Sequence, residues 1–206
     1  LLCFLFIING ANLIDGFNGL LAWQVIIINL ILIYVNVVYG QKDFATIITA
    51  QTIIFFIFLL FNFPMAKMFL GDGGSYAIGS LIALNVIKTS ILNPAIHPFF
   101  FCVILFYIFY EVFFSFFRKI LKGKSPLKPD RNHLHMLIFN KINKLNFKNS
   151  NALTGILMNL IYLSAILPAL FRFDFGPENA LFFRYWFFSL LIVYTIIYVR
   201  LYKSQK

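Results

Sequence analysis

Residues 20–39 read LLAWQVIIINLILIYVNVVY, an apolar stretch of 20 positions without one charged side chain. An α-helix of about 20 residues is about 30 Å long, which matches the hydrocarbon thickness of a bilayer. The stretch therefore predicts a helix that crosses a membrane, and it sets the class of fold for the residues around it.

Five further stretches have the same character, with short polar segments between them: residues 44–63, 76–92, 99–117, 152–171 and 180–201. Residues 76–92 are the least apolar because they include Asn85 and Lys88, although Lys88 lies near one end, where its amine can reach the interface. An apolar run over residues 1–8 would add a partial span. The sequence thus predicts an all-α, polytopic helical membrane protein with about six full spans and one partial span, forming a single domain over residues 1–206.

The composition points the same way. Of the 206 residues, 61% are hydrophobic and 12% are charged, and the mean hydropathy is +0.87. These values exclude a disordered chain and an ordinary soluble domain. The two cysteines, Cys3 and Cys102, lie in apolar runs and imply no disulfide framework.

The first apolar run has no basic segment before it and no small-residue cleavage site after it. It is therefore not expected to be a signal peptide. The run resembles the end of a helix whose start is missing, so we expect this sequence to lack N-terminal spans.

Basic residues predict the orientation. The formal net charge is +10, and alternating spans would place 13 of the 17 Lys and Arg residues on one side of the membrane. These are Lys67, the nine basic residues between Arg118 and Lys148, Arg200, Lys203 and Lys206. Because cytoplasmic loops are rich in Lys and Arg, that side is expected to face the cytoplasm, and no nucleic-acid partner is implied.

Acidic residues are scarce, and several of them lie on or near the basic side. Asp15, Asp72 and Asp130 fall in its loops, and Glu111 lies inside a span about two turns from the same side. An ionisable group in a span is a candidate functional residue. The alternative that remains open is that Glu111 pairs with a basic residue such as Arg118 to pack helices.

The first polar block is NGANLIDGFNGL over residues 9–20. If this block is helical, Asn12 and Asp15 share a face, and their oxygens are hard ligands suited to Mg²⁺. A polar helix end with a glycine turn would account for the same residues.

The second polar block is FLGDGGS over residues 69–75, at the start of an apolar run. Glycines and a helix N-terminus suit a phosphate, and Asp72 could hold Mg²⁺ against it. The block is not a P-loop, because no Gly-Lys-Ser/Thr follows. An ordinary helix entry capped by Asp72 remains the alternative.

The third block is the basic loop from Arg118 to His135. Its cations suit an anionic substrate or anionic lipid head groups. A simple positive-inside loop would explain the lysines but not Asp130, Arg131, His133 and His135. Two histidines at this spacing make a poor zinc site.

Together, the three blocks resemble the polyprenyl-phosphate N-acetylhexosamine-1-phosphate transferases (the WecA/MraY type, glycosyl transferase family 4). The matching positions are Asn9-x-x-Asn12-x-x-Asp15-Gly-x-x-Gly-Leu, then Phe-Leu-Gly-Asp72-x-Gly74-Ser. The third match is Glu111, followed by Arg118-Lys and Ser-Pro-x-x-Pro-Asp130-Arg131-x-His133-Leu-His135. This last form is more similar to the branch that primes O-antigen, enterobacterial antigen or teichoic acid synthesis than to the peptidoglycan branch.

The resemblance implies a reaction in which polyprenyl phosphate attacks the β-phosphorus of a UDP-N-acetylhexosamine and releases UMP. It implies Mg²⁺, with Mn²⁺ as a substitute, at Asn12 and Asp72, and catalytic positions at Asp15, Asp72, His133 and His135. The implied substrate-binding positions are Asn9, Asn18, Gly74, Glu111, Arg118, Lys124, Asp130 and Arg131. It further implies a multi-pass protein of the bacterial inner (plasma) membrane with a cytoplasmic active face. A homodimer stays open, and the motifs do not specify one UDP-sugar.

The sequence departs from the family pattern at four points. Asn18 and Glu111 stand where Asp is usual, and Met136 stands where His is frequent. The adjacent Asp-Asp pair of the family is absent from this sequence. We expect that pair on the missing N-terminal spans, so this chain alone is not expected to catalyse the reaction.

Two other classes of protein stay open as alternatives. A non-catalytic homologue would bind nucleotide sugar or serve as a structural partner. A transporter or channel would carry polar residues at mid-membrane in matched halves, whereas these blocks gather on one face.

Overall fold

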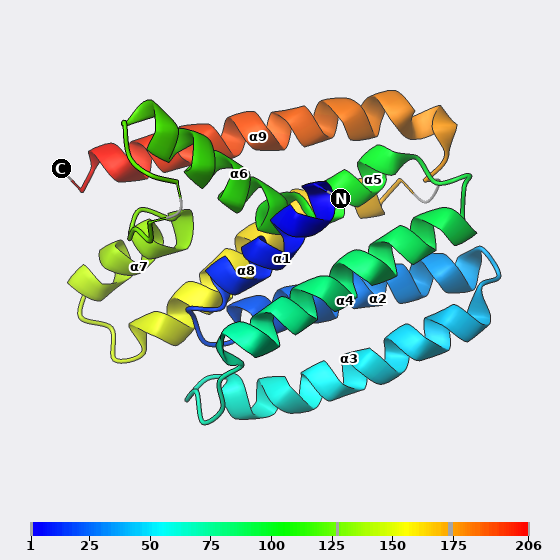
Figure 1. Ribbon diagram of the computed structural model, residues 1–206, viewed down its shortest axis with the longest axis horizontal. Coiled ribbons are helices and arrows are strands. Elements are labelled where there is room, and N and C mark those ends of the chain that lie inside the picture. Colours follow the sequence, from blue (N-terminus) through cyan, green and yellow to red (C-terminus); the bar gives the residue numbers. More distant parts are fainter. Residues whose placement is uncertain (1, 127, 173–174, 206) are drawn as a thin grey trace.

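The structure is a computed structural model that describes residues 2–126, 128–172 and 175–205. Its described residues form helices and no strands (Figure 1). The elements are α1 (Leu2–Ile14), α2 (Leu20–Val38), α3 (Lys42–Asn62), α4 (Gly71–Leu92), α5 (Pro98–Ile104), α6 (Phe106–Leu121), α7 (Leu134–Lys144), α8 (Ser150–Leu170), the 3₁₀ turn η1 (Pro177–Asn179) and α9 (Ala180–Lys203). The prediction of an all-α protein is confirmed.

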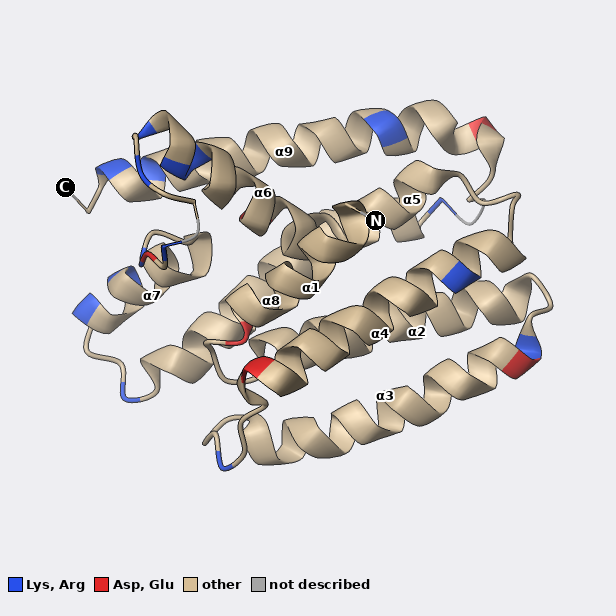
Figure 2. Ribbon diagram, in the orientation of Figure 1, with Lys and Arg blue, Asp and Glu red and all other residues tan. Residues whose placement is uncertain are grey.

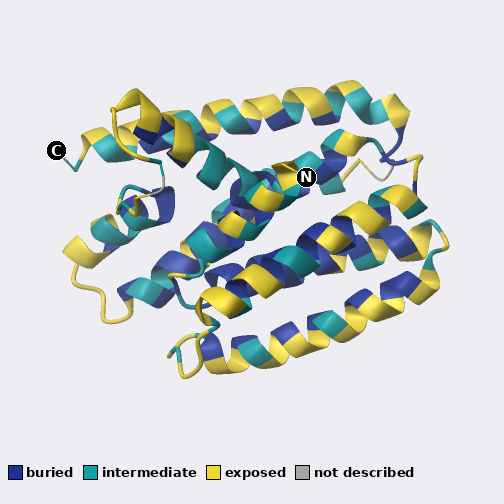
Figure 3. Cartoon of the chain, viewed as in Figure 1, coloured by how far each residue is buried: buried dark blue, intermediate teal, exposed yellow. Residues whose placement is uncertain are grey.

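Five helices in the described residues are long and apolar enough to cross a membrane, namely α2, α3, α4, α8 and α9. Exposed residues follow the outward faces of these helices (Figure 3). Many of them are apolar, such as Ile54 on α3 and Ile192 on α9. Such faces suit contact with lipid chains, which are as apolar as a protein core. The polytopic membrane class is therefore confirmed, with one correction to the number of straight spans.

That correction concerns residues 99–117, which were expected to form a single helix. They fall instead into α5 and α6, whose axes differ by 77°. Leu105 separates the two helices, and the Ile104 carbonyl accepts a hydrogen bond of 2.6 Å from the Tyr162 hydroxyl of α8. A continuous helix would use that carbonyl for the N–H four residues later. The bend thus coincides with a tertiary hydrogen bond to α8. No Pro or Gly within residues 99–117 indicated it in the sequence.

Two more expectations about local structure need correction. The first helix extends to Ile14 rather than ending at residue 8, and Asp15 lies beyond its end, so Asn12 and Asp15 do not share a helical face. Residues 134–144, expected as loop, form the short helix α7. This helix has an apolar face with Leu137, Ile138 and Ile142 buried, which a search for runs of about 20 apolar residues does not detect.

Helix α1 crosses α4 closely, and small residues make the crossing possible. A Cβ added to Gly79 would lie 2.9 Å from both Ala11 Cβ and Ile8 Cα. In membrane proteins small residues let helix backbones approach in this way. The crossing matters for the site because α1 carries Asn12 and α4 begins with Asp72.

Replacing Gly79 with Val is expected to push α1 and α4 apart. Overpacking of this kind costs about 1–3 kcal/mol of the free energy of unfolding, so the melting temperature of the purified protein should fall. The matched control is Gly73→Ala on the same helix, where an added Cβ meets nothing within 4 Å. Equal melting temperatures for the two variants would contradict the close crossing.

Lys and Arg gather at one end of the bundle, around α7, the ends of α6 and α9, and the α3–α4 turn (Figure 2). The acidic residue in the first turn of α4 lies at this same end. Lys206 and Leu127, which entered the charge count and the third block, lie outside the described residues. All three polar blocks therefore meet at the basic end of the bundle.

Candidate active site

A cavity of about 680 Å³ opens at the basic end, between α1, α6 and the loop that leads into α7. Its lining combines residues of the first and third blocks with apolar residues: Leu2, Leu5, Phe6, Asn9, Asn12, Leu13, Gly16, Phe17, Val112, Ser115, Phe116, Lys119, Pro126, Lys128, Pro129, Asp130, His133, His135 and Met136. Segments more than 100 positions apart thus form one site.

The second block reaches this site through Asn12. The Ser75 hydroxyl donates to Asn12 Oδ1 (2.6 Å), and Asn12 Nδ2 donates to the Tyr76 hydroxyl (3.1 Å). The same Ser75 hydroxyl lies 3.0 Å from the backbone carbonyl of Asp72. These bonds fix the Asn12 carboxamide beside the first turn of α4, where Asp72 is exposed.

Asp15 lies close enough to Asp72 for their charges to interact. Burial, with a further contribution from the charge of Asp72, raises the pKa of Asp15 to about 6. A second carboxylate that makes ionisation of Asp15 more costly marks a place where a cation is favoured. Asp15 and Asp72 do not belong to the cavity lining; they lie beside it, joined to it by Asn12.

The donor atoms in this corner are hard oxygens, from the carboxamide of Asn12 and the carboxylates of Asp15 and Asp72. Mg²⁺ is usually held by one or two carboxylates, with waters and substrate phosphates completing its shell. Among the described residues no group of three or more His, Cys, Asp or Glu side chains could hold a metal. The residues present therefore fit Mg²⁺ shared with a phosphate better than a metal held by protein alone.

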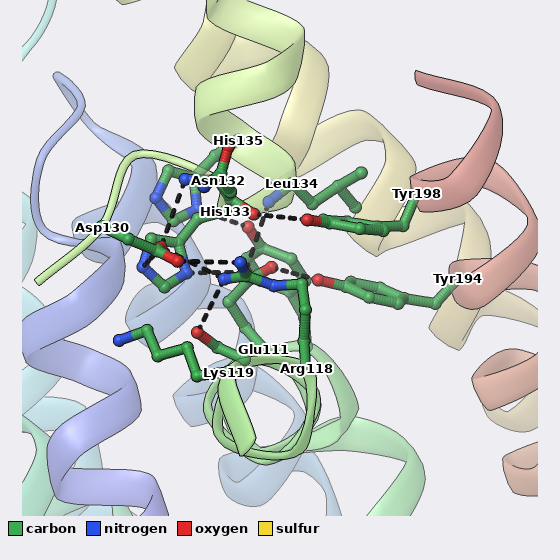
Figure 4. A network of polar contacts seen from close by, with 12 residues as sticks. Glu111, Arg118, Lys119, Asp130, Asn132, His133, Leu134, His135, Tyr194 and Tyr198 are labelled. Atoms are coloured by element: carbon green, nitrogen blue, oxygen red, sulfur yellow. Dashed lines mark hydrogen bonds and ion pairs between the residues drawn. The ribbon is translucent and has the colours of Figure 1, made fainter. Parts of the chain in front are cut away.

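Glu111 and His133 form the centre of a second, buried network (Figure 4). Glu111 is 1% exposed, and its Oε1 accepts from His133 Nδ1 (3.1 Å) and from the Leu134 N–H (3.2 Å). The Tyr194 hydroxyl of α9 donates to Oε2 (2.6 Å). The alternative that Glu111 pairs with a basic residue is met by His133 and not by Arg118, which was the example given.

Arg118 is instead paired with Asp130. Its two terminal nitrogens donate to the two carboxylate oxygens at 2.8 and 3.1 Å. Burial alone would raise the pKa of Asp130, but hydrogen bonds from Arg118 and the Asn132 N–H, with the charge of Arg118, hold it well below its usual value. The pair fixes the start of the loop that carries His133, whose Nε2 lies 3.4 Å from Asp130 Oδ1.

His135 stacks on His133, with ring centroids 5.5 Å apart. The Tyr107 hydroxyl and His135 Nδ1 are hydrogen-bonded at 2.9 Å, and the Phe17 ring makes a T-shaped contact with the imidazole, with ring centroids 5.4 Å apart. Burial lowers the pKa of His135 to about 4. At neutral pH the ring is therefore neutral and can accept or donate a hydrogen bond.

The remaining predicted residues are placed less directly. Asn9 lines the cavity, whereas Lys124 and Arg131 are exposed outside its lining. Gly74 packs against Leu70 in the first turn of α4. Asn18 holds the turn after α1: its N–H donates to Asn151 Oδ1 and its side chain donates to the Pro64 carbonyl, both at 2.7 Å.

Several site residues were not predicted from the sequence. The Lys119 amine donates to the carbonyls of Pro126 (3.1 Å) and Lys128 (2.7 Å) and so anchors the loop. Tyr194 and Tyr198 come from α9, where Tyr198 donates to the Asn132 carbonyl at 2.9 Å. Their spacing of four positions on one helix face was the only signal, and tyrosine is ordinary in so aromatic a chain.

Comparison with known proteins bears directly on this site. Residues 1–90 match the model of glycosyl transferase family 4. The chain is 30% identical over 163 residues to an undecaprenyl-phosphate alpha-N-acetylglucosaminyl 1-phosphate transferase of Thermotoga maritima, covering 78% of this chain and 49% of the relative.

Two further relatives have similar descriptions. A probable undecaprenyl-phosphate N-acetylglucosaminyl 1-phosphate transferase of Bacillus subtilis is 34% identical over 63% of this chain and 36% of its own length. A decaprenyl-phosphate N-acetylglucosaminephosphotransferase of Mycobacterium leprae is 27% identical over 63% of this chain and 37% of its own length.

The chain spans about half the length of the Thermotoga relative and less of the other two. No solved structure is significantly similar to it. The resemblance inferred from the sequence is confirmed for the part of the chain that is matched: residues 1–90 match glycosyl transferase family 4, and the relatives that align with the chain are described as polyprenyl-phosphate N-acetylglucosamine-1-phosphate transferases.

Proposed function

We propose that the protein transfers N-acetylhexosamine 1-phosphate from a UDP-N-acetylhexosamine to polyprenyl (undecaprenyl) phosphate, releasing UMP. This would be a priming step in the synthesis of a cell-envelope polysaccharide. The single observation that carries the proposal is the cavity of about 680 Å³, which joins a polar end for phosphates to an apolar end for a lipid chain.

The two ends suit the two substrates. Leu2, Leu5, Phe6, Val112 and Phe116 give an apolar wall between α1 and α6. A prenyl chain could lie along this wall, because burial of its methylenes is favourable there. The cation of Lys119 and the two histidines line the other end, where a diphosphate would find charge and hydrogen-bond donors.

Asn12 and Asp72, with Asp15 beside them, would hold the Mg²⁺ that we infer. The ion would neutralise charge on the diphosphate. This chain's own part is to position the groups: Ser75 and Tyr76 fix Asn12, and Glu111 and Tyr194 fix His133. Phosphoryl transfer gains most from such positioning and charge neutralisation.

The charge asymmetry supports a cytoplasmic active face in a bacterial plasma membrane. The site lies at the end of the bundle where Lys and Arg gather, and positive residues favour the cytoplasmic side. At that end of the bundle the proposed site would be open to a water-soluble nucleotide sugar.

The test is UMP release by the purified full-length protein from UDP-N-acetylglucosamine, with undecaprenyl phosphate and Mg²⁺ present. We expect release that requires the lipid phosphate and stops when EDTA removes the metal. Binding of UDP-N-acetylglucosamine without UMP release would support the non-catalytic alternative. Release that continues in EDTA would overturn the metal assignment alone.

Tyr194→Phe is expected to lower kcat/KM for the nucleotide sugar roughly 10-fold, because it removes a hydrogen bond to a buried charge. Glu111 would keep its bonds to His133 and Leu134 but lose its contact with α9. The matched control is Tyr185→Phe on the same helix, since Tyr185 is 67% exposed. Equal kinetics for the two variants would show that Tyr194 does not position His133.

A further inference from the structure

A second cavity, of about 340 Å³, lies between the last turns of α6 and α9. We call it the α6–α9 groove; its lining residues are Phe114, Phe117, Arg118, Leu121, Lys122, Thr195, Tyr198, Val199, Tyr202 and Lys203. It shares no lining residue with the larger cavity. The groove is therefore a separate feature on α6, where this helix meets α9.

The walls of the groove are apolar, and they are open to the surroundings. Phe117 and Val199 are each about half exposed, and Leu121 at the mouth is 86% exposed. Helix α9 is long and apolar enough to cross a membrane, α6 is the second arm of the bent α5–α6 pair, and both end at the basic end of the bundle (Figure 2). The groove thus lies where lipid chains meet lipid head groups, a level at which tyrosines such as Tyr198 and Tyr202 are also favoured.

The charge of the groove has one sign. No Asp or Glu of the described chain lines it, whereas three basic residues do, mainly through the carbon atoms of their side chains. Arg118 is occupied by Asp130, at 2.8 and 3.1 Å. Among the described residues, Lys122 and Lys203 have no acidic partner; the Lys122 amine donates to the Tyr202 hydroxyl at 3.0 Å and lies 4.1 Å from the centroid of its ring.

We propose that the α6–α9 groove binds an anionic phospholipid. One acyl chain would lie against Phe114, Phe117 and Val199, and the phosphate would meet Lys122 and Lys203. A zwitterionic lipid would bind less tightly, because no carboxylate in the lining can pair with its cationic group. Each of the two lysines is expected to raise the affinity for an anionic lipid ~5-fold, as lysines near a membrane surface do. The proposal does not depend on the transferase activity.

The test uses a tryptophan reporter in the groove, Phe117→Trp, with Trp23 and Trp186 replaced by Phe, in nanodiscs. Brominated phosphatidylglycerol and brominated phosphatidylcholine are compared as quenchers. We expect phosphatidylglycerol to quench at a several-fold lower mole fraction. Adding Lys122→Gln and Lys203→Gln should abolish this preference, whereas the control pair Lys141→Gln and Lys144→Gln on α7, with the same change of charge, should keep it.

Equal quenching by the two lipids would overturn the proposal, as would a preference that survives in the groove double variant. Displacement of brominated phosphatidylglycerol by an equal amount of polyprenyl phosphate would also overturn it, because the groove would then belong to the lipid substrate. Native mass spectrometry of the protein with its tryptophans intact provides a second measurement, the amount of phosphatidylglycerol that stays bound. Retained phosphatidylglycerol should fall in the groove double variant and not in the α7 pair.

Discussion

Asp72→Asn is expected to lower the rate of sugar-phosphate transfer by roughly 100-fold or more, while the protein still inserts into membranes and melts near the wild-type temperature. The change keeps the shape of the side chain and removes one negative charge. Loss of a group that holds charge at the reacting phosphates costs about this much in other enzymes. Asp72 is exposed in the first turn of α4, so no buried contact is lost with it.

The measurement is UMP release as a function of Mg²⁺ concentration. If Asp72 helps to hold the ion, residual activity of the variant should require more Mg²⁺ than that of the wild type. The matched control is Asp43→Asn, an exposed aspartate in the first turn of α3. Near-normal activity of Asp72→Asn would remove Asp72 from the proposed metal site.

Much of this architecture could be predicted because a membrane imposes a simple rule on sequence. A helix that crosses lipid needs about 20 apolar residues, and five such stretches became helices within a few residues of the expected bounds. The bend at Leu105 could not be predicted, because its partner is Tyr162, almost 60 positions away. The short helix α7 was missed because it buries one face rather than crossing a bilayer.

The site residues that could be predicted belong to types that are rare in this chain. Those that could not be predicted belong to types that are common in it. An aspartate or a histidine in so apolar a chain stands out, so the three blocks were visible. The pairing of charges was not: Arg118 binds Asp130, 12 positions later in the chain, rather than Glu111, seven positions earlier. Tyr194 resembles any other aromatic residue of a span until the fold brings it to Glu111.

His133→Ala is expected to weaken use of the nucleotide sugar more than use of polyprenyl phosphate. The ring is buried between Glu111 and Asp130, and it stacks on His135 at the polar end of the cavity. Its loss should lower kcat/KM for the UDP-sugar by roughly 100-fold. The apolar wall for the lipid chain, formed by α1 and α6, should remain.

The informative control is His133→Asn, whose amide can donate to Glu111 from nearly the position of Nδ1 (3.1 Å in the wild type). If His133 acts at the substrate through Nε2, Asn should restore the melting temperature but not the activity. If its role is only to hold the loop, Asn should restore both. An equal loss for both substrates in His133→Ala would likewise assign the residue to the structure of the loop, because the lipid and the UDP-sugar meet different ends of the cavity.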